Sequence, residues 1–286
     1  MTTVQITPTG QVCGAAVRGV DFSGDVDAET VAEIRAAWLE HHVLVFPDQE
    51  LTADDLDRFT LLFGPHGDDP FFESIEGHPH IAALHRPADE TASIFADTWH
   101  ADWSFQEYPP IGTCLYGKVI PPTGGNTLFA DQHAAYAAMP DELRKRIDGL
   151  TVVHSAKAGY SPDGLYGDAD ADSVRAMKII VSDEAYETQT HPLVRPHTET
   201  GEPVVYGTVG YICDVENMEA GEARELLVEV YRRQTRDEFV YEHRWEPNML
   251  VMWDNRSVLH KATGGYDGYE RLLHRTTIGD PRTVAS

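Results

Sequence analysis

The chain has 286 residues, of which 42% are hydrophobic, so it can bury a sizeable core. Its 22 basic residues face 47 acidic ones, a formal net charge of −25, which argues against nucleic acid and anionic membranes as partners. A small anionic substrate is still allowed, because a few local arginines can override the overall charge. The sequence shows no internal repeat or low-complexity linker, and we expect one domain over residues 1–286.

Three helices are predicted from apolar spacing. Residues 27–42 carry a helical stripe with Asp27 as a plausible N-cap. In "LTADDLDRFTLLFG" Thr52 can cap a second helix that Gly64 ends. Residues 221–233 form the third.

Short segments with strand character dominate the rest of the chain. They lie at 43–47, 112–120, 126–130, 238–245, 248–254 and 270–278, and turn residues such as "PPTGG" separate them. This pattern predicts a mostly β fold with flanking helices, a double-stranded β-helix or jelly-roll barrel of the cupin type. Two long stretches, 65–98 and 155–192, are rich in Gly, Asp, Pro and His, and are expected to be lid-like insertions.

The stretch "DTWHADWSF" places His100 and Asp102 two residues apart. In a strand, residues i and i+2 point to the same face, so the two side chains would converge. A surface hydrogen bond at a loop edge explains such a pair equally well. His260 ends "MLVMWDNRSVLH", a strand that is expected to reach the rim of the barrel, and is either an ordinary loop histidine or a third ligand. Two histidines and one carboxylate form the facial triad of non-haem iron(II) oxygenases.

The last predicted strand, "ERLLHRTTI", has Arg271 and Arg275 on one face. These arginines are either solvated or form a buried anion clamp. A buried, unpaired guanidinium costs several kcal/mol, so an inward pair implies an anionic ligand such as a dicarboxylate.

Together, His100-x-Asp102, "PPTGGNTLFA", "WDNRSVLH" and "RLLHRTTI" resemble the taurine dioxygenase family of iron(II)/2-oxoglutarate-dependent oxygenases. The resemblance implies that His100, Asp102 and His260 bind Fe(II), and that Thr127 and Arg271 hold the distal carboxylate of 2-oxoglutarate. It further implies that Arg275 and the backbone of Trp103 contact the substrate, and that the chain forms dimers or tetramers.

The implied reaction uses O2 to convert 2-oxoglutarate to succinate and CO2 while a substrate C–H bond is hydroxylated. Hydroxylation beside a heteroatom gives a product that fragments.

The chain departs from taurine-oxidising members where Asp69, Phe72 and Ala96 replace a histidine, a tyrosine and an asparagine. Asp69 would repel a sulfonate, although His66 could supply the missing histidine. A small polar molecule with an anionic end is therefore expected. In the alternative, Asp69 is a solvated loop residue and Arg275 pairs with a protein carboxylate, and Tyr160, Tyr166 and Tyr186 would then set selectivity.

Zinc bound by the same three residues, in a hydrolytic or non-catalytic cupin-like protein, is the competing reading. The cysteines, Cys13, Cys114 and Cys213, are too far apart for a zinc-finger spacing and suggest reduced thiols. The N-terminus lacks a signal-peptide pattern and no apolar run reaches 18 residues, so a cytoplasmic location is expected.

Overall fold

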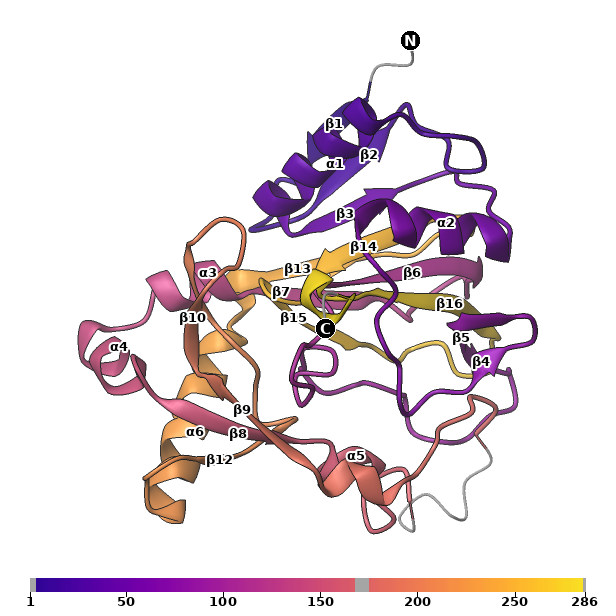
Figure 1. Ribbon diagram of the computed structural model, residues 1–286. Coiled ribbons are helices and arrows are strands. Elements are labelled where there is room, and N and C mark those ends of the chain that lie inside the picture. The colour runs from indigo at the N-terminus through magenta and orange to yellow at the C-terminus, as the bar shows by residue number, and fades with distance from the viewer. Residues whose placement is uncertain (1–3, 168–174, 285–286) are drawn as a thin grey trace.

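A sheet of eight strands forms the centre of the computed structural model, which describes residues 4–167 and 175–284 (Figure 1). All neighbouring strands run antiparallel except β2 and β3, which are parallel. In spatial order the strands are β1 (Gln5–Pro8), β2 (Ala15–Arg18), β3 (Val43–Phe46), β14 (Leu250–Asp254), β6 (Gly112–Val119), β16 (Arg271–Ile278), β5 (His78–Arg86) and β4 (Ser74–Ile75).

Smaller sheets complete the barrel. A second layer has the order β13 (Val240–His243), β7 (Thr127–Asp131) and β15 (Val258–Ala262). Beyond it lie β12 (Ile212–Val215), β8 (Thr151–Ser155) and β9 (Thr188–Pro192), and the hairpin of β10 (Val194–Pro196) and β11 (Pro203–Val205). Phe129 and Val258 of the second layer pack with Leu115, Trp253 and Leu273 of the large sheet in one buried cluster. The layers therefore face each other across an apolar interior.

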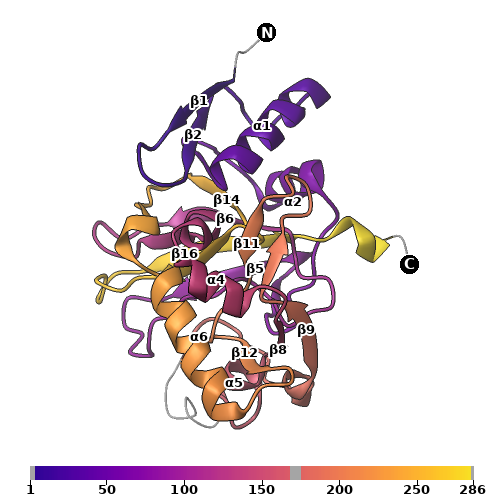
Figure 2. The ribbon, with the colours of Figure 1, turned by 90° about the vertical axis from the view of Figure 1, so that its left-hand side faces the viewer.

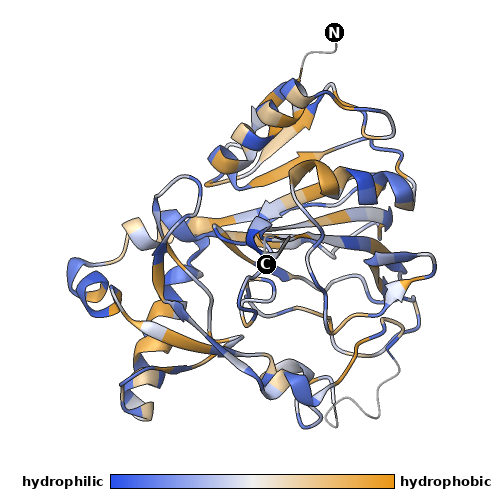
Figure 3. Cartoon of the chain, in the orientation of Figure 1, coloured by the Kyte–Doolittle hydropathy of each residue, from blue (hydrophilic) through white to orange (hydrophobic). Residues whose placement is uncertain are grey.

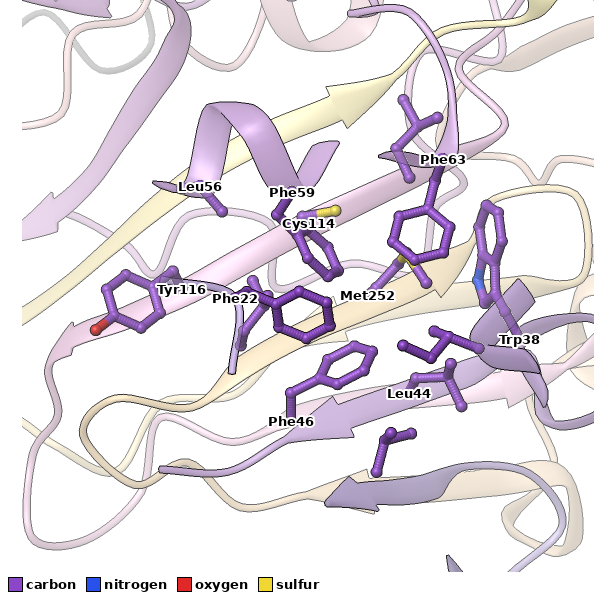
Figure 4. Packing of buried hydrophobic residues seen from close by; sticks show 14 of the residues in the cluster. Phe22, Trp38, Leu44, Phe46, Leu56, Phe59, Phe63, Cys114, Tyr116 and Met252 are labelled. Atoms are coloured by element: carbon purple, nitrogen blue, oxygen red, sulfur yellow. The ribbon is translucent and has the colours of Figure 1, made fainter. Parts of the chain in front are cut away.

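Helices lie outside the strands. The two longest near the N-terminus, α1 (Ala28–His41) and α2 (Ala53–Phe63), pack against the outer face of the large sheet through Trp38 and Phe59 (Figure 4). Both begin as predicted: Asp27 accepts from the backbone N–H of Thr30, and Thr52 forms a capping box with Asp55. Apolar residues, orange in Figure 3, concentrate where these elements meet.

Within residues 4–167 and 175–284, the remaining helices are α3 (Gln132–Ala137), α4 (Asp141–Ile147), α5 (Lys157–Tyr160), α6 (Ala220–Gln234) and three short 3-10 segments, η2 (Asp183–Tyr186), η3 (Asp237–Phe239) and η4 (Pro281–Val284). Helix α6 lies beside β8 and β12, at the end of the molecule opposite β1, β2 and α1 (Figures 1 and 2). Among the described residues, no helix combines the length and the apolar character that crossing a bilayer requires.

Several expectations need correction. The segment ending at His260 is two strands, because the chain turns at 255–257 and passes from the large sheet into the second layer. Residues 65–98 are not only a loop, since β5 within them pairs with β16 along five residues. The 155–192 stretch includes α5, η2 and β9, and its residues 168–174, which contain the acidic sequence "DADAD", lie outside the described residues. The polar, turn-rich composition of both stretches hid their regular structure.

Candidate metal centre and cavity

The proposed metal ligands come together from two segments far apart in sequence. His100 and His260 form an isolated antiparallel bridge, with each backbone N–H donating to the other's carbonyl at 3.0 and 2.8 Å. Asp102 Oδ1 lies 3.6 Å from His100 Nε2 and 3.7 Å from His260 Nε2. One ligand atom from each residue falls within 4.8 Å of the others, a separation that one metal ion can span. The pairing of His100 with β15 thus aims three donor atoms at one point.

The protonation states of these residues suit metal binding. His100 Nδ1 lies 2.8 Å from the carbonyl of Thr98, so it carries the proton and leaves Nε2 as the ligand atom. Burial lowers the pKa of His100, and burial beside His100 lowers the pKa of His260 to about 3, which keeps both rings neutral. Burial would raise the pKa of Asp102, but Arg275 and the two histidines hold it well below its usual range. Two neutral imidazoles and a carboxylate fit a divalent iron.

A chain of hydrogen bonds holds the second oxygen of Asp102. The Thr113 hydroxyl on β6 donates to Asp102 Oδ2 at 2.6 Å, and Asn255 Nδ2 donates to the Thr113 oxygen at 2.8 Å. Trp253 Nε1 in turn donates to Asn255 Oδ1 at 2.9 Å. These three residues are buried and orient the carboxylate. Sequence reasoning did not identify Thr113 or Asn255 as site residues, although Asn255 lies in the quoted "WDNR" motif.

Arg271 and Arg275 share the buried face of β16, as the strand alternation predicts. Arg271 donates to the carbonyl of Gly125 at 3.1 Å, and its buried Nε has no described partner. No ion pair among the described residues involves Arg271, whose pKa burial lowers. Gly125 takes a φ of +66°, and a Cβ there would lie 3.1 Å from Arg271 Nε. Because Gly125 of the predicted "PPTGG" turn has no side chain, the Arg271 guanidinium can lie close to the turn.

Thr127 lines the same cavity as Arg271. Its oxygen accepts a hydrogen bond from Trp245 Nε1 at 3.0 Å, which leaves the hydroxyl proton available to donate. A free guanidinium edge and a hydroxyl donor on one wall fit a carboxylate.

Arg275 is in a different situation, because it contacts two carboxylates. Its Nη1 lies 3.2 Å from Asp102 Oδ2, and its Nη2 lies 3.2 Å from Asp69 Oδ1. The rings of Phe72 and Trp103 lie 5.3 and 5.4 Å from its guanidinium carbon. Trp103 Nε1 also donates to Asp69 Oδ1. Asp69 is thus no solvated loop residue, and its side chain is 13% exposed.

A cavity between the two layers joins these groups. Arg271 and Thr127 line it together with the three ligands, Arg275 and Trp103. Phe72 and Ala96, at two of the three positions where the chain departs from taurine-oxidising members, also line it. The wall residues that sequence reasoning did not identify include Phe95, Met177, Tyr211, Leu84, Leu115, Trp253, Tyr266, Leu273 and the charged Arg86, Glu90 and Arg175.

Not all of the other residues predicted to contact the substrate line this cavity. Asp69 is not among the described residues that line the cavity but lies behind Arg275. His66 pairs with Asp57 at 3.2 Å and stacks on His80, so it does not take the place of the missing histidine. Tyr160 lines the cavity and packs on Tyr166, whereas Tyr186 is 42% exposed and bonds to Asp163.

The sequence of residues 4–277 matches the family model described as "Taurine catabolism dioxygenase TauD, TfdA family". The chain belongs to this family. It is 30% identical over 277 residues to the alpha-ketoglutarate-dependent sulfate ester dioxygenase of Pseudomonas putida, covering 96% of this chain and 89% of that one. It is 32% identical over 299 residues to the 2,4-dichlorophenoxyacetate dioxygenase of Cupriavidus pinatubonensis, covering 98% and 99%.

Solved structures agree with this TauD/TfdA assignment. A taurine dioxygenase from Burkholderia xenovorans has a TM-score of 0.79 and 30% identity, covering 96% of this chain and 90% of its own. AAD-2, solved with Mn(II) and N-oxalylglycine, has a TM-score of 0.77 and 28% identity, with 97% of each chain covered. The predicted jelly-roll fold is confirmed. The protein is an Fe(II)- and 2-oxoglutarate-dependent dioxygenase that acts on small molecules with O2 as co-substrate.

Proposed function

We propose that His100, Asp102 and His260 hold the Fe(II) of this dioxygenase, and that Arg271 with Thr127 holds the distal carboxylate of 2-oxoglutarate. The buried Arg271, without a carboxylate partner among the described residues and in the same cavity as the triad, carries this proposal. A buried guanidinium is costly unless an anion completes it. A zinc hydrolase with the same three ligands would have no use for that arrangement, which makes this alternative the weaker one.

When bound, iron and 2-oxoglutarate supply the oxidising chemistry, in which one atom of O2 enters succinate and the other the hydroxylated product, with release of CO2. The protein residues position and shield this chemistry. Thr113 and Asn255 keep Asp102 in one orientation, and Arg271 sets the direction of the co-substrate. The aromatic wall would exclude water and hold a substrate C–H bond close to the proposed metal ligands.

We propose that the substrate is a small organic molecule lying against Trp103 and Arg275, with Asp69 acting through Arg275. Relatives named for sulfate esters and for 2,4-dichlorophenoxyacetate support a substrate with an oxygen beside the attacked carbon. Hydroxylation at such a carbon gives a hemiacetal-type product that breaks at the C–O bond.

We further propose that the protein is cytoplasmic, which its three free cysteines support, and that it forms a homo-oligomer, which the family resemblance supports. Light scattering would test the assembly.

Three variants test the assignment of residues. We expect His260→Ala to lose tight Mn(II) binding in calorimetric titration. Arg271→Ala should keep Mn(II) binding but raise the Kd for 2-oxoglutarate about ten- to hundredfold, because a charge-assisted pair contributes about 1.5–3 kcal/mol. Thr127→Ala should give a smaller increase in the same constant.

Arg236→Ala is the matched control, because Arg236 is a half-exposed arginine paired with Glu238 outside the cavity. It should leave both binding constants unchanged. An unchanged Kd for 2-oxoglutarate in Arg271→Ala would contradict the assigned clamp. Hydrolysis with zinc, without 2-oxoglutarate-dependent O2 uptake in the unaltered enzyme, would contradict the proposed function itself.

A further inference from the structure

Asp69 bonds to Arg275 and Trp103, which line the cavity together with the three proposed metal ligands. The part of the cavity next to these residues is called its metal side. Its Oδ1 accepts from Arg275 Nη2 at 3.2 Å, from Arg275 Nε at 3.4 Å and from Trp103 Nε1. The Arg275 side chain is 5% exposed, and the rings of Phe72 and Trp103 flank its guanidinium. A third N–H group, on Nη1, bonds to Asp102. Most of the hydrogen-bonding capacity of Arg275 is therefore already committed within the protein.

Around the proposed metal ligands, the charges of the loaded site also balance without a substrate charge. The negative charges of Asp102 and of 2-oxoglutarate, three together, would offset the two positive charges of a divalent iron and the one of Arg271. Asp69 offsets Arg275. A second anion beside Arg275 would be buried without a counter-charge, which is costly in a site of low dielectric.

The surrounding wall is aromatic rather than polar. Phe72, Phe95, Trp103, Tyr160, Tyr211 and Met177 line it. The charged residues farther along the wall have contacts of their own: Arg86 pairs with Glu90 at 3.3 Å, and Arg175 lies over the ring of Tyr166 at 5.5 Å. Such a surface suits a flat, uncharged ring.

We infer that Asp69 is a specificity-determining residue: its pairing with Arg275 neutralises the metal side of the substrate cavity, so the part of the substrate seated there is uncharged and aromatic. This inference rests on the proposed function. It assigns Arg275 to positioning Asp102 and Asp69 instead of binding a substrate anion.

The test uses benzamide and benzoate, which are similar in size and shape but differ in charge. Their Kd values would be measured by calorimetry on the full chain loaded with Mn(II) and N-oxalylglycine, in the unaltered enzyme and in Asp69→Asn. The variant removes one negative charge and keeps an acceptor for Trp103. Asp68→Asn, the same change at the exposed neighbouring residue, is the matched control.

We expect the unaltered enzyme and Asp68→Asn to bind benzamide about tenfold or more tightly than benzoate. Asp69→Asn should bind benzoate about tenfold or more tightly than the unaltered enzyme does, with benzamide changed less than threefold. Asp68→Asn, which lies outside this network, should leave Mn(II) and N-oxalylglycine binding unchanged.

A preference of the unaltered enzyme for benzoate, or no binding of either ring, would overturn the inference even if Asp69→Asn did not fold. An unchanged benzoate affinity in a folded Asp69→Asn would do the same. Failure of the unaltered enzyme to bind Mn(II) and N-oxalylglycine would instead contradict the proposed function.

Discussion

At the scale of single residues, Thr113 links the proposed metal ligand Asp102 to the body of the protein. Its hydroxyl donates to Asp102 and accepts from Asn255. Thr113→Val keeps the shape of the side chain but removes its hydrogen bonds with Asp102 and Asn255. The Asn255 amide N–H is then left without that acceptor. We expect Mn(II) affinity to fall about ten- to hundredfold and the free energy of unfolding to fall by about 1–3 kcal/mol. Thr113→Ser should restore both.

A second valine variant separates the two effects. Thr60 forms a buried hydroxyl pair with Thr276 at 2.7 Å, and neither residue lines the metal cavity. Thr60→Val should therefore lower stability while Mn(II) affinity stays constant. Equal losses of Mn(II) affinity in Thr60→Val and Thr113→Val would show that Thr113 acts only on stability.

At the scale of elements, helix α2 is a support for the outer face of the large sheet. Its capping box holds the first turn: the backbone N–H of Thr52 donates to Asp55 at 2.8 Å, and the backbone N–H of Asp55 donates to the Thr52 hydroxyl at 3.2 Å. We expect Thr52→Ala to lower the free energy of urea unfolding by about 1 kcal/mol. Binding of 2-oxoglutarate should not change, because α2 supplies no residue to the cavity. Thr52→Ser should match the unaltered enzyme, and a loss in that variant would contradict the capping explanation.

At the scale of the whole molecule, buried neutral histidines make stability depend on pH. Burial beside His191 and Arg195 lowers the pKa of His154 to about 3, against about 6.5 in the unfolded chain. Between these values the unfolded state binds a proton that the folded state does not, so stability is full above pH 6.5 and is lost as the pH falls toward 3. From pH 7.5 to 5.5 this residue contributes a loss of about 1.4 kcal/mol.

Urea unfolding of metal-free protein at these two pH values measures the effect. His154→Gln should lose about 1.4 kcal/mol less than the unaltered protein over the same interval. The fully buried imidazole bonds to Ser104 through Nδ1, and its Nε2 has no described partner to hold a proton. An identical pH dependence in both proteins would mean that His154 is protonated in the folded state.

Local pattern determined much of this protein. The apolar stripes of α1, α2 and α6 and the N-caps of α1 and α2 were predictable, because a helix start depends on residues within one turn. The alternation of β16 placed Arg271 and Arg275 on one buried face for the same local reason. The role of the three proposed ligands followed from their residue types and spacing together with the family resemblance.

Only the tertiary structure decided which groups share the cavity and which charges cancel. Arg275 meets an aspartate 206 positions earlier in the chain, and Asp102 meets Thr113 on a strand of the large sheet. The passage of the chain from the large sheet to the second layer before His260 also escaped prediction, since the polar residues 254–257 mark a break but do not show which sheet the next strand joins. Strand pairing over long sequence distances sets these contacts, and periodicity within one segment contains no information about the segment that faces it.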